Sequence, residues 1–527
     1  MLMLVLTTMA MAVSSCALSG GPRQYDLAVY GATPGGIAAA VAAARMRERV
    51  CLVAENEHVG GMMASGLGNT DAGNPDYIGG ISAEVFRRIA EHYRGTYGES
   101  SAQYEACAQG FHFEPHVAEA VFEQMLQEAS VDLLRGWRLQ GIEFSLNQIS
   151  SLAVVNNASG EQRSVEASFF IDASYTGDLY AEAGCPFSVG REARGDYGES
   201  MAGHIYQHHE TREVLPGSTQ EADSLVQAYN YRLCLTDSSA NSAPWPEPEN
   251  YNPADYTILH DFIEQRRGDP RNGESLTPRD FLNIDPLPNR KYDINNYGHC
   301  WLSTDLIGGS QGYPQGTYEE RQAIEHAHRE HILGLFKFLR TDPGIPAGLR
   351  EQFARYGLAA DEFSDNGNWP FQLYVREARR LHGEVVFTQL DATVDTLKEE
   401  SVGMGSYNLD SHATGPLRSG YRWREGFFIL PARPYQIPYR IMVPIWVRNL
   451  LAPVCVSATH VGYGTIRMEP VWMILGHAAG VAASLCLDIN CEAHECPVTQ
   501  LQQVLREQGQ IISHGQARDW NGFIRAN

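Results

Sequence analysis

The sequence predicts an α/β fold built on a parallel sheet, with a second lobe inserted into it. Three observations predict this class: apolar segments at 25–30 and 50–54, a glycine-containing turn and Ala-rich segment between them, and a shift to Pro, Asn, Tyr and His over 191–430. All-apolar strands belong in parallel sheets that are covered on both faces. A chain of 527 residues is also too long for one simple core, so two lobes are expected.

The elements follow in chain order. Strands at 25–30 and 50–54 flank a helix at about 35–46, which makes a β-α-β unit. Amphipathic helices follow near 80–94 and 115–129, and Pro115 suits a first helical turn. Alternating residues between 131 and 171 predict a small antiparallel meander, which returns to the sheet at 167–172.

The domain boundaries follow from composition. Residues 25–190 are predicted to form the first part of the sheet domain, 191–430 an inserted α+β substrate lobe, and 431–527 the second part with a C-terminal helix. A helix at about 469–487 includes 18 uncharged residues, Pro470 to Leu487, so a membrane span must be weighed. His477, the small residues Gly476 and Gly480, and the absence of flanking basic clusters favour a helix buried against a sheet.

The charge and the N-terminal segment bear on partners and location. A net charge of −23 without a basic cluster excludes a nucleic-acid partner. Residues 1–13 form an apolar run that suits an export signal, although no Lys or Arg precedes it. Residues 13–16 resemble a bacterial lipobox, so Cys16 would be lipidated and would tether a periplasmic or outer-membrane protein. Residues 1–24 are then a signal and tether; the alternative is a misplaced start codon or a frayed tail.

The cysteines and histidines do not predict a metal site. Ten cysteines are too sparse for a disulfide framework, although a bridge from Cys491 to Cys496 is open to an exported protein. Neither CxxC nor a zinc spacing occurs. Two histidine groups remain, 204–209 and 326–331, and the second is expected on the solvated face of an amphipathic helix at 318–340.

The turn after the first strand has most of a dinucleotide-binding pattern. Gly31 and Gly36 occupy the first and third glycine positions, while Thr33 stands at the second. Glu55 ends the second strand, where an acid can accept hydrogen bonds from ribose hydroxyls and disfavours a 2′-phosphate. The turn therefore predicts a dinucleotide other than NADP, the alternative being an ordinary Gly-rich turn of an α/β fold.

Two later segments support a cofactor. Gly60 and Gly61 follow the acid at a distance that brings flexible backbone back over a bound cofactor, within a Gly-rich stretch that includes Met62 and Ser65. The segment 169–178 is an apolar strand that enters a turn containing Gly177 and two aspartates.

The ordered set of motifs resembles the flavoproteins with two dinucleotide-binding folds that are related to fumarate reductase and glutathione reductase. Within that superfamily it resembles the bacterial FAD-dependent oxidoreductase family, some members of which are named xanthan-lyase-like and in which Thr or Ser followed by Pro is common in the turn. The motifs that carry the resemblance are 31–36, Glu55, 60–62 and 172–178, with further segments at 226–236, 291–296, 303–308, 373–380, 403–412 and 457–470. It spans about 25 to 510.

The resemblance implies FAD, with Glu55 on the adenosine ribose and the turn at 31–36 on the pyrophosphate. The helix that starts near Glu469 would direct its positive end at N1 and the C2 carbonyl of a reduced flavin. The expected cofactor-binding residues are Gly31, Thr33, Pro34, Gly35, Gly36, Glu55, Gly60, Gly61, Met62, Ser65, Asp172, Gly177, Asp178 and Arg467.

Flavin chemistry needs orientation, a proton acceptor and charge control. His460, just before the flavin-facing helix, is the first candidate base, and His412 beside Asp410 is the second; a loop histidine bonded to backbone is the alternative for His460. If their segment is helical, Arg376 would share a face with Arg379 or Arg380 and clamp an anionic or polyhydroxylated substrate; the alternative is a solvated basic face paired with Glu377 and Glu384.

These residues predict an exported flavoenzyme that transfers hydride from an alcohol-type C–H bond, with a small-molecule or glycan substrate and an undefined electron acceptor. A second hypothesis is a reductase that passes hydride from FAD to an activated double bond, as the fumarate reductase relationship allows. A third is a lipid-anchored glycan-binding or lyase-like protein, in which FAD is absent or structural.

Overall fold

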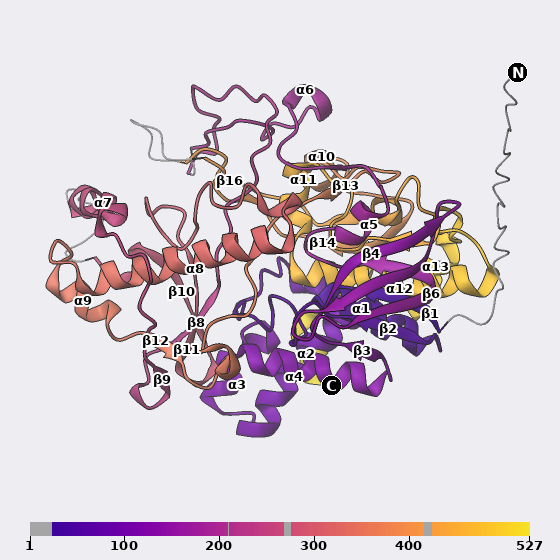
Figure 1. The fold of residues 1–527 in the computed structure, drawn as a ribbon, viewed down its shortest axis with the longest axis horizontal. Coiled ribbons are helices and arrows are strands. Elements are labelled where there is room, and N and C mark those ends of the chain that lie inside the picture. Colours follow the sequence, from indigo (N-terminus) through magenta and orange to yellow (C-terminus); the bar gives the residue numbers. More distant parts are fainter. Residues whose placement is uncertain (1–23, 209, 268–275, 416–423, 527) are drawn as a thin grey trace, which may run out of the picture.

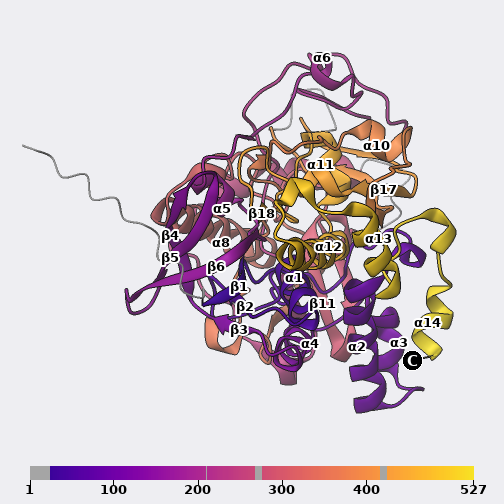
Figure 2. The same ribbon diagram turned by 90° about the vertical axis from the view of Figure 1, so that its right-hand side faces the viewer.

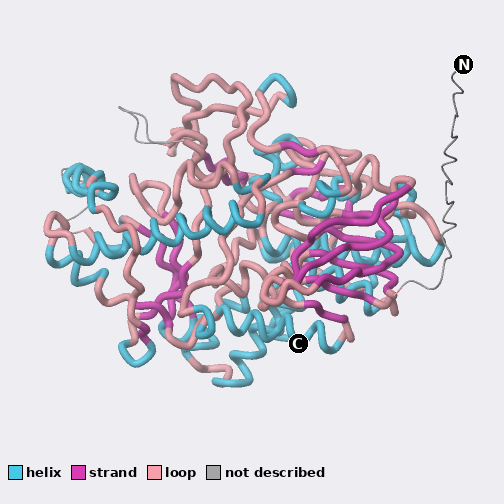
Figure 3. The backbone as a smooth tube through the Cα atoms, viewed as in Figure 1, coloured by secondary structure: helices cyan, strands magenta, loops and turns pink. Residues whose placement is uncertain are grey.

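The computed structural model describes residues 24–208, 210–267, 276–415 and 424–526. The predicted signal, the lipobox and Cys16 lie outside the described residues. Two sheets contain most of the strands, with the larger sheet at the right of Figure 3 and the smaller one at the left.

The larger sheet is the predicted parallel sheet with its meander. Its seven strands run in the order β3 (Asp132–Leu134), β2 (Val50–Val53), β1 (Tyr25–Tyr30), β6 (Gln162–Asp172), β5 (Gln148–Asn156) and β4 (Trp137–Ser145), while β18 (Leu450–Leu451) also pairs with β6. β1, β2, β3, β6 and β18 pair in parallel, and β4, β5 and β6 pair antiparallel. The α/β fold class and the meander are confirmed.

Two helices from opposite ends of the chain lie against each other beside this sheet (Figure 2). α1 (Pro34–Arg45) begins at the proline after Thr33, and α12 (Glu469–Ile489) is the long apolar helix. A Cβ on Gly476 would lie 1.9 Å from the Gly35 carbonyl oxygen, so the two backbones touch. Among the described residues, α12 is the one helix with the length and hydropathy to cross a membrane, and 94% of its most apolar window is buried in the protein.

Further helices cover the domain. α2 (Gly80–Tyr97) and α4 (Pro115–Glu128) follow the prediction closely, and α4 has its proline in the first turn. α2 packs on α12, and α4 packs on α1 and α2. The shorter helices are α3 (Ala102–Ala106), α5 (Asp178–Glu182), α6 (Arg194–Tyr197), α10 (Gln389–Thr393), α11 (His460–Ile466), α13 (Val498–Glu507) and α14 (Trp520–Ala526).

The smaller sheet lies within the segment predicted as an inserted lobe. Its strands are ordered β10 (Leu282–Leu287), β11 (Lys291–Asn296), β8 (Leu233–Thr236), β12 (Gly357–Ala359) and β9 (Ser242–Ala243), and they are antiparallel. α7 (Ile258–Arg267), α8 (Tyr318–Thr341) and α9 (Ala347–Phe353) belong to the same segment. α8 runs from this lobe towards the larger sheet (Figure 1).

Three two-stranded pairs lie outside the two larger sheets. They are β7 (Phe187–Ser188) with β13 (Arg380–Leu381), β14 (Ser401–Gly405) with β17 (Tyr435–Pro438), and β15 (Leu409–Ser411) with β16 (Phe428–Leu430). Near the end of α12, Cys491 and Cys496 are both free thiols, and Cys496 instead hydrogen-bonds Cys486.

Candidate functional site

The turn between β1 and α1 has glycines at the positions where its backbone comes closest to other backbone. Gly31 has a φ of +104°, and a Cβ there would lie 2.6 Å from the backbone of Ala173. A Cβ on Gly36 would lie 1.9 Å from the Gly31 carbonyl oxygen. Both predicted glycine positions are therefore sterically required, because no larger residue leaves the turn and the strand ends this close.

Thr33 and Pro34 start the helix. The Thr33 hydroxyl accepts a hydrogen bond from the Gly36 amide at 3.1 Å and donates one to the Ala173 carbonyl at 2.9 Å. Thr33 is thus the N-cap of α1, and Pro34 supplies the fixed φ of the first turn. The threonine at the second glycine position therefore closes the turn instead of weakening it.

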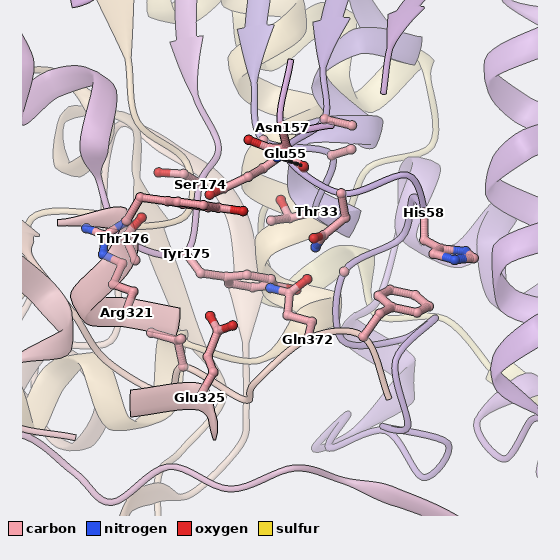
Figure 4. Close-up of a pocket in the computed structure, with 18 of the residues that line it drawn as sticks. Thr33, Glu55, His58, Asn157, Ser174, Tyr175, Thr176, Arg321, Glu325 and Gln372 are labelled. Carbon is pink, nitrogen blue, oxygen red and sulfur yellow. Dashed lines mark hydrogen bonds between the residues drawn. The ribbon is translucent and has the colours of Figure 1, made fainter. Parts of the chain in front are cut away.

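A cavity with about 950 Å³ of empty space, part of it open to solvent, lies against this turn. We call it cavity 1. Figure 4 shows Glu55 and Asn157 on one side, with Arg321 and Glu325 facing them from α8. Its lining comprises Tyr30–Thr33, Ala54–Asn56, His58, Gly61, Asn157, Ser174–Thr176, Tyr313, Tyr318, Arg321, Gln322, Glu325, Phe371, Gln372 and Val375.

Glu55 presents an open carboxylate to cavity 1. Among the residues that the structure describes, none donates a hydrogen bond to this carboxylate; the residue's backbone carbonyl accepts one from Asn157. Burial, assisted by the negative charge of Asp178, raises the pKa of Glu55 to about 7. A buried carboxylate without a hydrogen-bond donor is suited to a vicinal diol, because the two hydroxyls of the diol would donate hydrogen bonds to it.

Asp178, a predicted cofactor-binding residue, has its carboxylate paired with two arginines, and its contact with the cofactor stays a prediction. Arg321 from α8 donates to both of its carboxylate oxygens at 2.7 Å, and Arg379 donates to one of them at 2.6 Å. Burial alone would raise the pKa of Asp178, but these guanidinium groups outweigh it and lower the pKa to about 2. Arg379 is held by Asp178 and by the Thr176 carbonyl, to which it donates at 3.0 Å, and its role as a substrate clamp stays a prediction.

Asp172 and Gly177 shape the turn after β6. The buried Asp172 carboxylate accepts from the Ser174 amide at 3.0 Å, the Ser174 hydroxyl at 2.7 Å and the Tyr180 amide at 3.0 Å. Gly177 has a φ of +68° and precedes α5. The two residues hold Ser174, Tyr175 and Thr176 at the cavity wall, and their own contact with the cofactor stays a prediction.

The glycine-rich loop after β2 closes the other side. The Gly60 amide donates to the Ala32 carbonyl at 2.9 Å, which fixes the loop on the turn. The Met62 amide donates to the Tyr175 hydroxyl at 3.0 Å, and a Cβ on Gly61 would lie 2.3 Å from that hydroxyl. The Ser65 hydroxyl accepts from the Gln372 amide at 2.9 Å. Of the predicted residues in this loop, Gly61 lines the cavity, whereas Gly60, Met62 and Ser65 position its wall.

A second cavity, cavity 2, has about 920 Å³ of empty space and lies between the lobes. Gln372 and Val375 line cavity 1 while Tyr374 lines cavity 2, so the segment 372–375 separates the two. The lining of cavity 2 comprises Asn69, Asp71, Arg232, Asn283, Asp285, Asn295–His299, Tyr374, Tyr407, Asn408, Asp410, His412, Phe427, Ile429 and Arg467.

Arg467 lies on cavity 2, away from Glu55. One of its guanidinium nitrogens donates to the Asp410 carboxylate at 3.1 Å and the other to the Tyr374 hydroxyl at 3.3 Å. It sits two residues before α12, whose N-terminus carries the positive end of the helix dipole. Arg467 therefore adds positive charge to the wall of cavity 2 nearest α12.

His412 is the histidine of the predicted pair that reaches a cavity. Its Nδ1 lies 2.8 Å from Asp305 Oδ2, and Arg376 lies 3.0 Å from the other Asp305 oxygen. Burial and the nearby Arg376 lower the pKa of His412, so the imidazole is neutral at pH 7. Burial would raise the pKa of Asp305, but Arg376 and His412 outweigh it and lower the pKa. An ionised Asp305 requires the proton on Nδ1, which leaves Nε2 as an acceptor.

His460 lines neither cavity 1 nor cavity 2, and its role as the first candidate base stays a prediction. Its side chain is 1% exposed, its Nδ1 lies 2.8 Å from Glu377, and its Nε2 lies 3.2 Å from the Ser411 hydroxyl. Glu377 also pairs with Arg380. His460 begins α11, and it links that helix to the buried Glu377 instead of meeting a substrate.

The segment that carries Arg376 and Arg379 is not helical, so the condition for a shared helical face is not met. The segment 370–379 is irregular, because its amides bond to distant partners: the Tyr374 amide donates to the Asn230 carbonyl at 2.8 Å. Arg376 is fully buried and donates to the Asn230 side chain at 3.0 Å. It acts on cavity 2 through Asp305 and does not line it.

The carboxylates of the candidate metal cluster are already paired with a lysine. Among the described residues, one cluster, Glu114, His116 and Glu362, is close enough together to hold a metal ion. The Lys291 ammonium already lies 2.7 Å from Glu114 and 2.6 Å from Glu362. On α8, His328 is fully buried and is not on the solvated face that was predicted; burial lowers its pKa to about 4.

Sequence reasoning missed the contribution of α8 to cavity 1. Tyr318 and Arg321 lie in the first turn of α8, which a capping box of Thr317 and Glu320 starts. The capping box predicts the start of the helix but not the residues that the helix contacts. Asp305, which orients His412, was also missed as a functional residue. No local signal pairs residues this far apart in the sequence.

Comparison with known proteins gives one match over nearly the whole chain. A family model described as FAD dependent oxidoreductase matches residues 26–505. A search of curated protein sequences gives no match.

Solved structures give weaker likenesses. The chondrochloren halogenase CndH of a myxobacterium, described as a variant of FAD-dependent halogenases, is 12% identical with a TM-score of 0.37, over 95% of this chain and 86% of that one. A geranylgeranyl bacteriochlorophyll reductase-like protein from Thermoplasma acidophilum is 11% identical with a TM-score of 0.36, over 92% and 84% of the two chains. Glycerol-3-phosphate dehydrogenase from Bacillus halodurans, complexed with FAD, is 10% identical with a TM-score of 0.23, over 36% and 44%.

The residues of cavity 1 fit the adenosine diphosphate end of FAD. The glycine cradle leaves backbone amides at the N-terminus of α1, where a pyrophosphate is stabilised. The open Glu55 carboxylate suits the ribose diol. Gly31, Thr33, Glu55 and Gly61 would hold this end together with Tyr318 and Arg321 of α8.

Proposed function

The chain belongs to the family of FAD-dependent oxidoreductases, and on that premise we propose that it oxidises an alcohol group of a polyhydroxylated substrate, such as a carbohydrate, bound in cavity 2. The observation that carries this proposal is the His412–Asp305 pair. It offers a neutral imidazole, held in one tautomer by a carboxylate, at the wall of a cavity next to the cofactor site. Alcohol oxidation needs such a base, because the hydroxyl must lose its proton as the carbon loses hydride.

The lining of cavity 2 supports a neutral, hydroxyl-rich substrate. Asparagine and aspartate side chains supply many hydrogen-bonding groups, among them Asn69, Asn295 and Asp285, and the rings of Tyr297 and Phe427 provide apolar surface. Sugars have both kinds of surface, polar edges and apolar C–H faces. A cavity of this composition binds them through several oriented hydrogen bonds.

The proposed roles of the residues follow from their contacts. Nε2 of His412 accepts the proton of the substrate hydroxyl, and the resulting imidazolium is stabilised by Asp305 through Nδ1. Arg376 holds Asp305 ionised and is itself screened from the cavity. FAD, when bound, supplies the acceptor for the hydride that leaves the same carbon. Tyr374 and Arg467 fix the wall between the two cavities.

The test is anaerobic reduction of the FAD-loaded protein by sugars and simple alcohols, followed as loss of the yellow flavin absorbance. His412→Gln should slow reduction by about 10²- to 10⁴-fold and remove the acidic limb of the pH–rate profile, because the neutral imidazole is the active form. His299→Gln, on the same cavity, is the matched control and should retain most of the rate. Equal losses in both variants would show that His412 is not the base.

A reductase of an activated double bond is the second candidate. Arg232 and Arg467 on cavity 2 favour it, since such substrates often carry carboxylates. Both guanidinium groups are already paired, Arg232 with Asp293 at 2.8 Å, and cavity 2 also contains Asp71, Asp285 and Asp410. If no alcohol bleaches the flavin while fumarate-like acceptors reoxidise the dithionite-reduced protein, this candidate replaces the first.

A further inference from the structure

Large apolar side chains are exposed together at one edge of the larger sheet. Leu146 at the β4–β5 hairpin is 86% exposed, Ile445 and Trp446 before β18 are 54% and 58% exposed, and Ile489 at the end of α12 is 57% exposed. We call these four residues the apolar edge.

Direct hydrogen bonds connect the three segments that carry them. The Arg448 amide donates to the Asn147 carbonyl at 2.9 Å, which fixes the loop before β18 against the hairpin. The Ala493 amide donates to the Arg448 carbonyl at 2.7 Å, which fixes the chain after α12 to the same loop. Leu146, Trp446 and Ile489 therefore lie on adjoining segments although they are far apart in the sequence.

The clustering is not a general property of this surface. Of the described large apolar residues, six are more than half exposed, and four of these six form the apolar edge. The other two, Val394 and Leu397, lie just after α10. Isolated exposed apolar residues are ordinary in proteins, whereas a cluster on connected loops marks an interaction surface.

The described chain enters the fold at this edge. Tyr25, the first residue of β1, pairs with Ala167 of β6, and the Asn449 side chain donates to the carbonyl of Ser168 at 3.0 Å on the other side of β6. The right-hand side of Figure 1, which faces the viewer in Figure 2, shows the start of β1 beside the meander. Cys16 precedes Gln24 by eight residues, a reach of at most about 27 Å for extended chain.

We propose that the apolar edge docks onto the surface of a lipid bilayer, with Trp446 and Ile445 inserted among the headgroups. A lipid on Cys16 would hold this edge within the reach of the short tether, and tryptophan is favoured at the membrane interface. The neighbouring charges are paired within the protein, Arg448 with Glu492 at 3.0 Å and Arg49 with Asp26 at 2.8 Å. With a net charge of −23 the protein gains nothing from anionic lipid, so docking depends on apolar insertion.

The experiment measures partitioning of the full FAD-loaded chain into phosphatidylcholine vesicles by co-sedimentation. Cys16→Ser is used as the parent, which removes acylation from the comparison. Ile445→Gln with Trp446→Gln should lower the partition coefficient about tenfold, because two side chains lose their burial in the interface. Val394→Gln with Leu397→Gln is the matched control and should leave it unchanged.

The salt dependence of binding and the oligomeric state distinguish a lipid surface from a second copy of the chain. Binding by the parent should persist when salt rises from about 0.1 M to about 0.5 M, as apolar insertion is not screened. The proposal is overturned if the parent does not bind vesicles, if both double variants lose binding equally, or if binding is unchanged in the Ile445/Trp446 variant. A parent dimer that this variant dissociates, without any effect on vesicle binding, would assign the edge to a second copy.

Unchanged FAD content and thermal unfolding verify that the variants fold, since all four replaced side chains are exposed.

Discussion

Glu55 differs from the other acidic residues around cavity 1 in what faces its carboxylate. Asp178 is held by two arginines, and Glu325 accepts from the Tyr313 hydroxyl at 2.7 Å. Glu55 has no such donor among the described residues, and its pKa is raised to about 7. Binding of a ribose diol would therefore stabilise its charged form and release a proton near neutral pH.

This predicts pH-dependent affinity for FAD. Because the carboxyl of the FAD-free protein binds a proton below about pH 7, affinity should fall as the pH drops through 7. Glu55→Gln should weaken binding about tenfold to a hundredfold and flatten this dependence. Quenching of flavin fluorescence on titration measures both. The exposed neighbour Glu57→Gln is the control, and an unchanged slope in Glu55→Gln would assign the titrating group elsewhere.

His58, at the wall of cavity 1, bridges two parts of the chain. Its Nδ1 lies 2.9 Å from Glu119 of α4, its Nε2 lies 2.9 Å from Asp365, and its ring stacks on Phe371 with the centroids 4.2 Å apart. Neither neutral tautomer can donate to both carboxylates, so the contact requires an imidazolium. The hydrogen bond that His58 donates to Glu119 outweighs burial and raises the pKa of His58.

The sign of the resulting pH effect is fixed by the direction of that shift. A raised pKa in the folded state means that the stabilisation is complete below the ordinary histidine value of about 6.5 and is lost as the pH rises through the raised value. Wild type should exceed His58→Gln in stability by about 1 kcal/mol at pH 6, and the gap should close towards pH 9. Thermal unfolding of the loaded protein at several pH values tests this; a gap that widens with pH would refute it.

Much of cavity 1 was predictable residue by residue, and most of cavity 2 was not. Gly31, Gly36 and Glu55 lie within one β-α-β unit, so their spacing in the sequence fixes their spacing in space. His412 meets Asp305 across 107 residues, and nothing local to either distinguishes it from His460. The His460 side chain is buried by residues that are distant in the sequence, so its burial could not be predicted from the residues around it.

At the scale of elements, the helix starts were the most predictable feature. Prolines in the first turn mark α1 and α4, and both begin at those residues. The conformation of the segment 370–379 was not predictable, because arginines three residues apart are compatible with a helix but do not create one. Its amides instead bond to Asn230 and Ser65, and tertiary contacts override the local pattern.

The contact between α1 and α12 is a testable property of two elements. A Cβ on Gly476 would lie 1.9 Å from the backbone oxygen of Gly35, so Gly476→Ala should cost about 3 kcal/mol of unfolding free energy. It should also weaken FAD binding, because Gly35 belongs to the cofactor turn. Gly95→Ala in α2, where a Cβ meets nothing within 4 Å, should instead stabilise by about 0.5–1 kcal/mol. Chemical denaturation compares the two; equal effects would contradict the packing argument.

At the scale of the whole molecule, Lys291 ties the lobes together. It is fully buried on β11 of the smaller sheet, and its ammonium contacts Glu114, which precedes α4, as well as Asp361 and Glu362. Burial would lower the pKa of Lys291, but Glu362 and the other nearby negative groups outweigh it and raise the pKa. The network therefore stays charged throughout the physiological range.

Lys291→Met should leave two buried carboxylates without a counter-charge and cost about 3–5 kcal/mol. The exposed pair of Lys337 with Glu247 is the matched comparison, and Lys337→Met should cost at most about 1 kcal/mol. Denaturant unfolding of both variants measures the difference. Similar costs would show that Lys291 does not hold the lobes.

Length and composition predict a middle segment of different character, but they do not predict how that segment contacts the rest of the chain. Composition separates the Pro- and Asn-rich middle of the chain from the apolar ends. The docking of α8 on cavity 1 depends on Arg321 finding Asp178, a pair 143 residues apart in sequence. Such pairings follow from how the packed lobes fit together, and local patterns do not encode them.

The contact of α12 with α1 also sets an order of assembly. The turn that would receive the pyrophosphate is made within the first 36 residues, yet the helix that supports it ends at residue 489, and β18 joins the same sheet only at residue 450. A growing chain therefore has the binding motif long before it has the support that keeps the motif in shape. On this argument we expect FAD to be retained only by chains that extend through α12, so colour in a preparation reports chains that have reached about residue 489.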